Sequence, residues 1–159
     1  MKLKGILMED FLQYKKPCMT LQFPTCSFKC DKDAGKPVCQ NGELATAPNI
    51  EYSINTICRA YRNNDITTAI CCQGMEPFDN WDELLEFIKT VREIHKISDD
   101  IVIYTGYYEN EISEKISTLA QFNNIIVKFG RFIPNSPHIY DDILGVELAS
   151  NNQYGKRIC

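Results

Sequence analysis

Three cysteines in one short stretch have the residue type and the spacing to share a metal. Cys26, Cys30 and Cys39 lie within FPTCSFKCDKDAGKPVCQN, whereas the other five cysteines are scattered along the chain. Thiolates bind soft metals, so the candidates are zinc and an iron-sulfur cluster. A cluster held by three cysteines leaves one iron open to a small molecule. The stretch therefore predicts a metal site at which three thiols converge.

Zinc is the alternative that spacing alone leaves open. A structural zinc ion takes four protein ligands, and a fourth could come from the scattered cysteines, which are Cys18, Cys58, Cys71, Cys72 and Cys159. Unliganded thiols are a weaker interpretation, because exposed free cysteines in a loop invite oxidation.

Composition limits the class of protein. The chain has 159 residues, of which 44% are hydrophobic, and this fits one domain with its own core. A net charge of −4 argues against nucleic acid or anionic lipid as the main partner. No stretch reaches the roughly 18 apolar residues of a membrane span, and the N-terminus lacks the apolar region of a signal peptide. We therefore expect a cytoplasmic protein with reduced thiols, where clustered cysteines indicate metal binding or catalysis.

Alternating apolar and amphipathic stretches predict repeated βα units, and hence an α/β fold with a mostly parallel sheet. Four or five strands are too few for a closed eight-stranded barrel, so we expect an open, partial (βα) barrel. The expected strands are 18–23, 66–72, 101–105 and 124–130, and a further strand is indicated within 143–149. The expected helices begin after Pro48, at a capping box formed by Asn80 and Glu83, and near residue 110. Residues 1–159 then form a single domain with a metal loop over 24–41 and an irregular C-terminal segment over 131–159.

Each of the first three predicted strands is followed by a segment whose residues could bind a ligand or take part in chemistry. The cysteine loop follows the first strand, GMEP follows the second and YTGY follows the third. Carboxyl ends of parallel strands meet at one edge of a sheet, where ligands bind. Gly74 allows a ligand to approach the backbone, and Glu76 can direct a carboxylate to the same edge. Each turn alone is also what an ordinary strand-to-helix connection would show.

In this order, the three segments resemble those of the radical S-adenosylmethionine enzymes. More narrowly, they are similar to the small activating proteins of anaerobic ribonucleotide reductase, in which GxEP, IYTGY, GRFI and a segment like SNNQ recur. Here these motifs occupy 74–77, 103–107, 130–133 and 150–153, so the resemblance covers nearly the whole chain from residue 23 to residue 153.

The resemblance implies a partial barrel of the radical S-adenosylmethionine type. It implies that Cys26, Cys30 and Cys39 bind a [4Fe-4S] cluster whose open iron is chelated by S-adenosyl-L-methionine. It further implies that the backbone around Gly74 and Met75, with Glu76, receives the methionine amino group. Thr105 would lie beside the sugar, so the implied cofactor-binding residues are Gly74, Met75, Glu76 and Thr105. One-electron cleavage would give a 5′-deoxyadenosyl radical. The implied partners are a glycyl-radical reductase subunit and a low-potential electron donor such as flavodoxin or ferredoxin.

The chain departs from the family pattern at three points. The cysteines are spaced by three and then eight residues, where the family usually has three and then two. Val38 precedes the last cysteine in place of an aromatic residue that packs on adenine, so Phe28 becomes a candidate for that contact. Phe129 stands before Gly130, where the activating proteins more often carry an acidic residue.

Two further functions stay open from the sequence. One is a radical S-adenosylmethionine enzyme that modifies another peptide or a nucleotide. The other, from a different class, is a zinc-stabilised binding module in which GMEP and YTGY are only turns.

Overall fold

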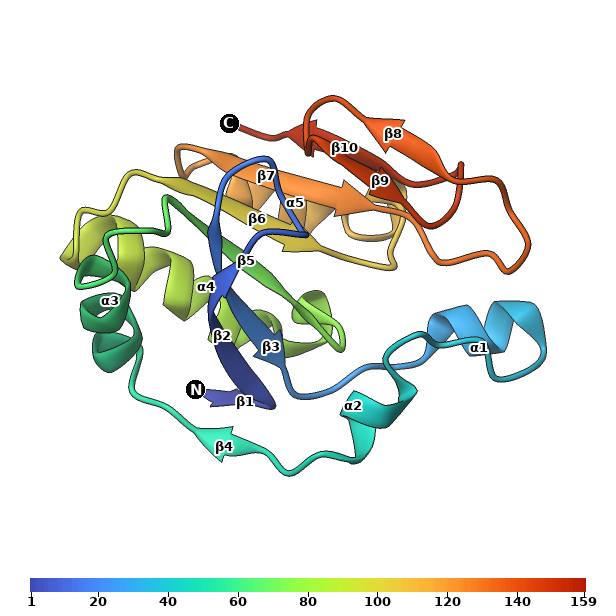
Figure 1. The fold of residues 1–159 in the computed structure, drawn as a ribbon, viewed down its shortest axis with the longest axis horizontal. Coiled ribbons are helices and arrows are strands. Elements are labelled where there is room, and N and C mark those ends of the chain that lie inside the picture. Colours follow the sequence, from blue (N-terminus) through green and yellow to red (C-terminus); the bar gives the residue numbers. More distant parts are fainter.

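A computed structural model describes residues 1–159 and shows an α/β fold built on a six-stranded sheet (Figure 1). The order in this sheet is β10-β7-β6-β5-β3-β2. The strands are β1 (Lys2–Leu3), β2 (Gly5–Asp10), β3 (Cys18–Phe23), β4 (Ile50–Glu51), β5 (Ala69–Gly74), β6 (Asp100–Tyr104), β7 (Ile125–Phe129), β8 (Ile139–Asp141), β9 (Val146–Leu148) and β10 (Tyr154–Arg157). The inner strands β3, β5, β6 and β7 run parallel, and the edge strands β2 and β10 pair antiparallel with them. The sheet is open, and the partial barrel stays a prediction.

Helices connect the parallel strands. They are α1 (Lys29–Ala34), α2 (Gly42–Thr46), α3 (Ile54–Arg62), α4 (Trp81–Lys89) and α5 (Ser113–Leu119), with 3-10 turns η1 (Pro77–Asn80) and η3 (Glu109–Glu111) and a π-helical turn η2 (Thr90–Ile94). No helix has the length and apolar character needed to cross a membrane.

The sheet has two different faces because side chains alternate along each strand. One face packs against α3, α4 and α5 in the main core, to which β6 contributes Ile101 and Ile103. The other face, with Val102, forms a smaller core that is covered by loops rather than by long helices. Those loops meet where the Lys15 amide donates to the Leu144 carbonyl at 2.8 Å. The loop-covered face is therefore where a cavity can open.

The expected and observed elements differ mainly at the start of β5 and in the C-terminal segment. The strand β3 has the expected bounds, whereas β5 begins at Ala69 because Ile66 lies in a turn with 47% of its surface exposed. Segment 131–159, expected to be irregular apart from a strand within 143–149, contains the three strands β8, β9 and β10. The polar strand β10 is held by its antiparallel pairing with β7, which residue type alone does not indicate.

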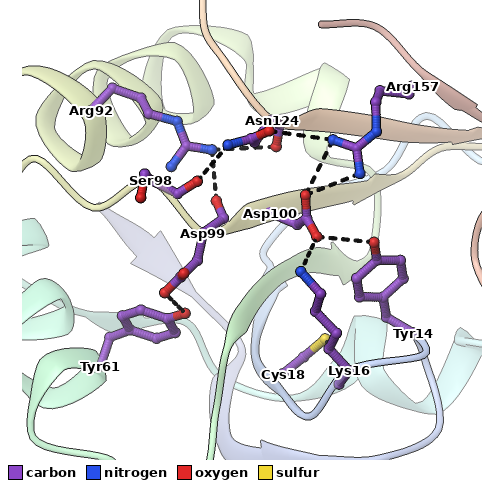
Figure 2. A network of polar contacts seen from close by, with 10 residues as sticks. All are labelled: Tyr14, Lys16, Cys18, Tyr61, Arg92, Ser98, Asp99, Asp100, Asn124 and Arg157. Atoms are coloured by element: carbon purple, nitrogen blue, oxygen red, sulfur yellow. Dashed lines mark hydrogen bonds and ion pairs between the residues drawn. The ribbon is translucent and has the colours of Figure 1, made fainter.

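A polar network fixes the end of the sheet at which β6 begins (Figure 2). The Asp100 carboxylate is nearly fully buried and accepts hydrogen bonds from Tyr14 at 3.1 Å, Lys16 at 2.6 Å and Arg157 at 3.1 Å. Burial works to raise the pKa of Asp100, but these hydrogen bonds outweigh it and hold the pKa below its usual range. The network joins the loop before β3 and the end of β10 to the central strand β6.

Candidate functional site

A cavity of about 380 Å³ opens at the carboxyl ends of the parallel strands. In Figure 1, α1 lies off this side of the sheet, beyond the arrowheads of β5, β6 and β7. All the predicted site residues except Phe28 line the cavity, namely Cys26, Cys30, Cys39, Gly74, Met75, Glu76 and Thr105. The structure therefore brings the ends of three strands and the cysteine loop together around one space.

Gly106 marks the point where the sequence motifs meet. A Cβ added there would lie 3.6 Å from Cys30 Sγ, 3.6 Å from Glu76 Oε2 and 3.8 Å from Arg131 Cγ. Thus the cysteine loop, GMEP and GRFI each place a residue beside the glycine of YTGY. Any larger side chain at this position would occupy the space between the Cys30 thiol and the Glu76 carboxylate.

Glu76 is the buried carboxylate of the cavity wall, with 4% of its surface exposed. It accepts hydrogen bonds from the Phe78 amide at 3.1 Å, the Thr105 hydroxyl at 2.8 Å and the Gly106 amide at 2.8 Å. Burial raises its pKa to about 7, although these three donors act in the opposite direction. Glu76 is therefore held rigidly, and its charge changes near neutral pH.

The GMEP turn is tied to the start of the cysteine loop. The Glu76 amide donates to the Thr25 carbonyl at 2.9 Å, and Asn80 Nδ2 donates to the Glu76 carbonyl at 2.8 Å. Asn80 Oδ1 also accepts from the Thr25 hydroxyl. The expected capping box of Asn80 and Glu83 is wrong, because the Asn80 side chain is used in these contacts and caps no helix.

Gly74 lies so close to β3 that no other residue fits there without strain. Its φ is +96°, and an added Cβ would lie 2.8 Å from Gln22 Cα and 2.9 Å from the Phe23 nitrogen. Its carbonyl accepts a hydrogen bond from Asn41 Nδ2 at 2.7 Å. The glycine thereby also holds the far end of the cysteine loop against β5.

Ion pairs anchor α1, the helix inside the cysteine loop, to the sheet. Arg131 is nearly buried and pairs with Asp33 at 2.8 Å and with Glu111, which also pairs with Lys29 at 2.9 Å. The side-chain hydrogen bonds from Arg131 are the main cause of the lowered pKa of Glu111, which is about 2. Both ends of α1 are thus connected to residues that follow β6 and β7.

The three thiols share the cavity with a buried cation. Burial raises the pKa of Cys26 to about 12 and also raises the pKa of Cys30, which Lys128 and Arg131 act to lower. Lys128 lines the cavity, donates to the Gly130 carbonyl at 2.9 Å, and has its pKa lowered to about 8 by burial. No three His, Cys, Asp or Glu side chains are placed to hold a single metal ion.

Lys128 lines the cavity although none of the motifs contains it, and Phe132 lines it although no role was predicted for it. Lys128 interrupts an otherwise apolar strand, and Phe132 lies within GRFI. Phe28 does not line the cavity, whereas Phe132 does, and the Phe132 backbone forms a hydrogen bond with Cys30. The only sequence signal for Lys128 was its position two residues after Ile126. Residues two apart in a strand lie on the same face, and Ile126 lies on the loop-covered face.

The fold and cavity define an α/β protein with a thiol-lined ligand site at the carboxyl ends of its parallel strands. Residues 18–153 match the family described as a 4Fe-4S single cluster domain, and the chain belongs to this family. The protein is thus an iron-sulfur protein, which favours a cluster over zinc. A search of curated proteins and a search of solved structures each found no match.

The Glu76 carboxylate predicts how the stability of the metal-free protein changes with pH. Its pKa in the folded state, about 7, lies above the ordinary 4.5. Protonated Glu76 therefore stabilises the fold below about pH 4.5, and this contribution is lost as the pH rises through 7. We expect wild type to lose about 2–3 kcal/mol relative to Glu76→Gln between pH 5 and pH 8. Denaturant unfolding at several pH values measures this difference, and parallel curves for the two proteins would contradict it.

Proposed function

We propose that the protein is a radical S-adenosylmethionine enzyme in which Cys26, Cys30 and Cys39 hold the [4Fe-4S] cluster. The donor set fits such a group, because three soft thiols from one loop line the same cavity. The observation that carries the proposal is the meeting of the cysteine loop, GMEP, YTGY and GRFI around Gly106. These are the segments on which the resemblance to this enzyme class rests.

The chain's own residues have distinct parts in this function. Cys26, Cys30 and Cys39 would hold the cluster, which when bound would supply the electron for reductive cleavage of S-adenosylmethionine. Glu76 accepts three hydrogen bonds from the protein and keeps acceptor capacity for the methionine ammonium group. Thr105 is fixed by its bond to Glu76 beside the ligand's sugar. Lys128 and Arg131 place positive charge near Cys30, which favours the thiolate that binds iron.

The substrate in this proposal is a glycine of a large protein partner, the reductase subunit of an anaerobic ribonucleotide reductase. A macromolecular substrate is supported by the open side of the cavity, where Leu12 is a lining residue with 78% of its surface exposed. Phe11 beside it is 61% exposed. A flavodoxin or ferredoxin would supply the electron. The second candidate is an enzyme of the same chemistry that acts on another peptide or on a nucleotide.

Anaerobic reconstitution tests the proposal. After reduction with dithionite, we expect about four irons per chain and equal amounts of methionine and 5′-deoxyadenosine from S-adenosylmethionine. With the reductase subunit added, a glycyl-radical signal by electron paramagnetic resonance is expected. Cleavage without that signal would favour the second candidate. A reduced cluster that leaves S-adenosylmethionine intact, with or without the subunit, would contradict the enzyme class.

A further inference from the structure

The eight residues between Cys30 and Cys39 pose a geometric problem, since both cysteines must reach the same cavity. The chain leaves Cys30 as the short helix α1 and reverses at Gly35, whose φ is +65°. The Lys36 amide donates to the Asp31 carbonyl at 3.2 Å and closes this reversal. No residue of α1 is buried, so contacts with the apolar core do not fix the segment that returns from Gly35 to Cys39.

The Asp31 side chain fixes it instead. Its Oδ1 atom accepts hydrogen bonds from the Val38 amide at 2.7 Å and from the Cys39 amide at 2.8 Å. Hydrogen bonds to a carboxylate are stronger than those between neutral groups. Asp31 directly follows Cys30 in the chain, so this one carboxylate joins the backbone of the second cysteine to the backbone of the third.

Other contacts of the loop do not replace this one. Asp33 and Lys29 attach α1 to Arg131 and Glu111, but neither of them contacts Cys39. Asn41 attaches the chain two residues beyond Cys39 to the Gly74 carbonyl. The Cys39 amide has no hydrogen bond except the one to Asp31.

We propose that Asp31 is the positioning residue for Cys39, and that it makes a spacing of three and then eight residues compatible with a cluster site. This inference rests on the proposed ligand role of the three cysteines. Asp31 closes the eight-residue excursion, so the Cys39 thiol is presented beside Cys30 before iron binds. Without the carboxylate, the third ligand would have to be ordered at the moment of binding, at a cost in conformational entropy.

The test compares Asp31→Ala, Asp31→Asn and Asp33→Ala after anaerobic reconstitution, by the rate at which a chelator removes iron. Two lost hydrogen bonds predict release about tenfold faster for Asp31→Ala. Asparagine keeps an Oδ1 acceptor, so Asp31→Asn is expected to stay within about threefold of wild type. Asp33→Ala removes the same charge and one solvent-exposed ion pair of the same helix but no hydrogen bond to Cys39, and is expected to stay within about twofold. The electron paramagnetic resonance spectrum of the reduced cluster should change only in Asp31→Ala.

The outcomes separate this inference from the proposed function. Unchanged iron release in Asp31→Ala would overturn the role of Asp31, and so would equal acceleration in Asp31→Ala and Asp33→Ala. A cluster that survives replacement of any one of the three cysteines by alanine would instead overturn the ligand assignment. Thermal unfolding of the metal-free variants serves as the folding control, since α1 contributes nothing to the buried core.

Discussion

Replacing Cys30 with alanine is expected to abolish the cluster and every activity that depends on it. Cys30 Sγ lies beside Gly106, the glycine around which the motifs meet. No spare thiol lines the cavity, because the remaining cysteines lie elsewhere in the fold. Losing an outer-shell partner of a metal typically costs 10–100-fold, so loss of a direct ligand should exceed about a hundredfold. Iron and sulfide analysis and the yield of 5′-deoxyadenosine measure the effect.

Cys159→Ala is the matched control for this prediction. Cys159 is exposed and does not line the cavity, and its thiol lies 4.0 Å from Asn123 Oδ1. The control should keep the iron content and the cleavage activity of wild type. If Cys30→Ala retained a full cluster while Cys159→Ala lost it, the ligand assignment would be wrong.

Asp100→Asn is expected to destabilise the fold by weakening the polar network at the start of β6. The substitution removes the charge that orders Tyr14, Lys16 and Arg157 around β6 (Figure 2). Hydrogen bonds to charged groups contribute about 1.5–3 kcal/mol, and the half-exposed Lys16 and Arg157 reduce their share through solvent screening. We expect a loss of about 2 kcal/mol, measured by denaturant unfolding at pH 7.

The pH dependence of this loss has a definite sign. The pKa of Asp100 is lowered in the folded state, so its contribution is present above the ordinary value of 3.8 and is lost as the pH falls below it. Wild type and Asp100→Asn should therefore converge in stability in acid. Asp142 is exposed in the turn between β8 and β9, and Asp142→Asn should unfold like wild type. A change below about 0.5 kcal/mol in Asp100→Asn would refute the structural role.

The sequence was most informative where chain-local signals act. The strand β3 ends at Phe23, directly before Pro24, which cannot donate to a sheet, and the cysteine loop therefore begins where expected. The carboxyl ends of β5 and β6 carry GMEP and YTGY to one cavity, as parallel pairing requires. These features depend on residue type and on neighbours in the chain, so a pattern can predict them.

Long-range contacts could not be predicted in the same way. Asp100 follows another aspartate in an ordinary turn sequence, and its partners lie 57–86 positions away. The polar strand β10 gains its place only from pairing with β7. Asn80 has the residue type of a helix cap, yet a stronger set of contacts with Thr25 uses its side chain. Each of these depends on partners that only the folded chain brings near.

The loop-covered face of the sheet has a consequence for biosynthesis. Residues 146–149 and Gln153 line the same cavity as the cysteines, yet the ribosome makes them about a hundred residues later. Because chains emerge N-terminal end first, the three thiols are solvent-exposed while the later wall of the cavity is still being translated. Iron delivery is thus expected after translation, and the nascent chain needs a reducing environment until its last strands have folded.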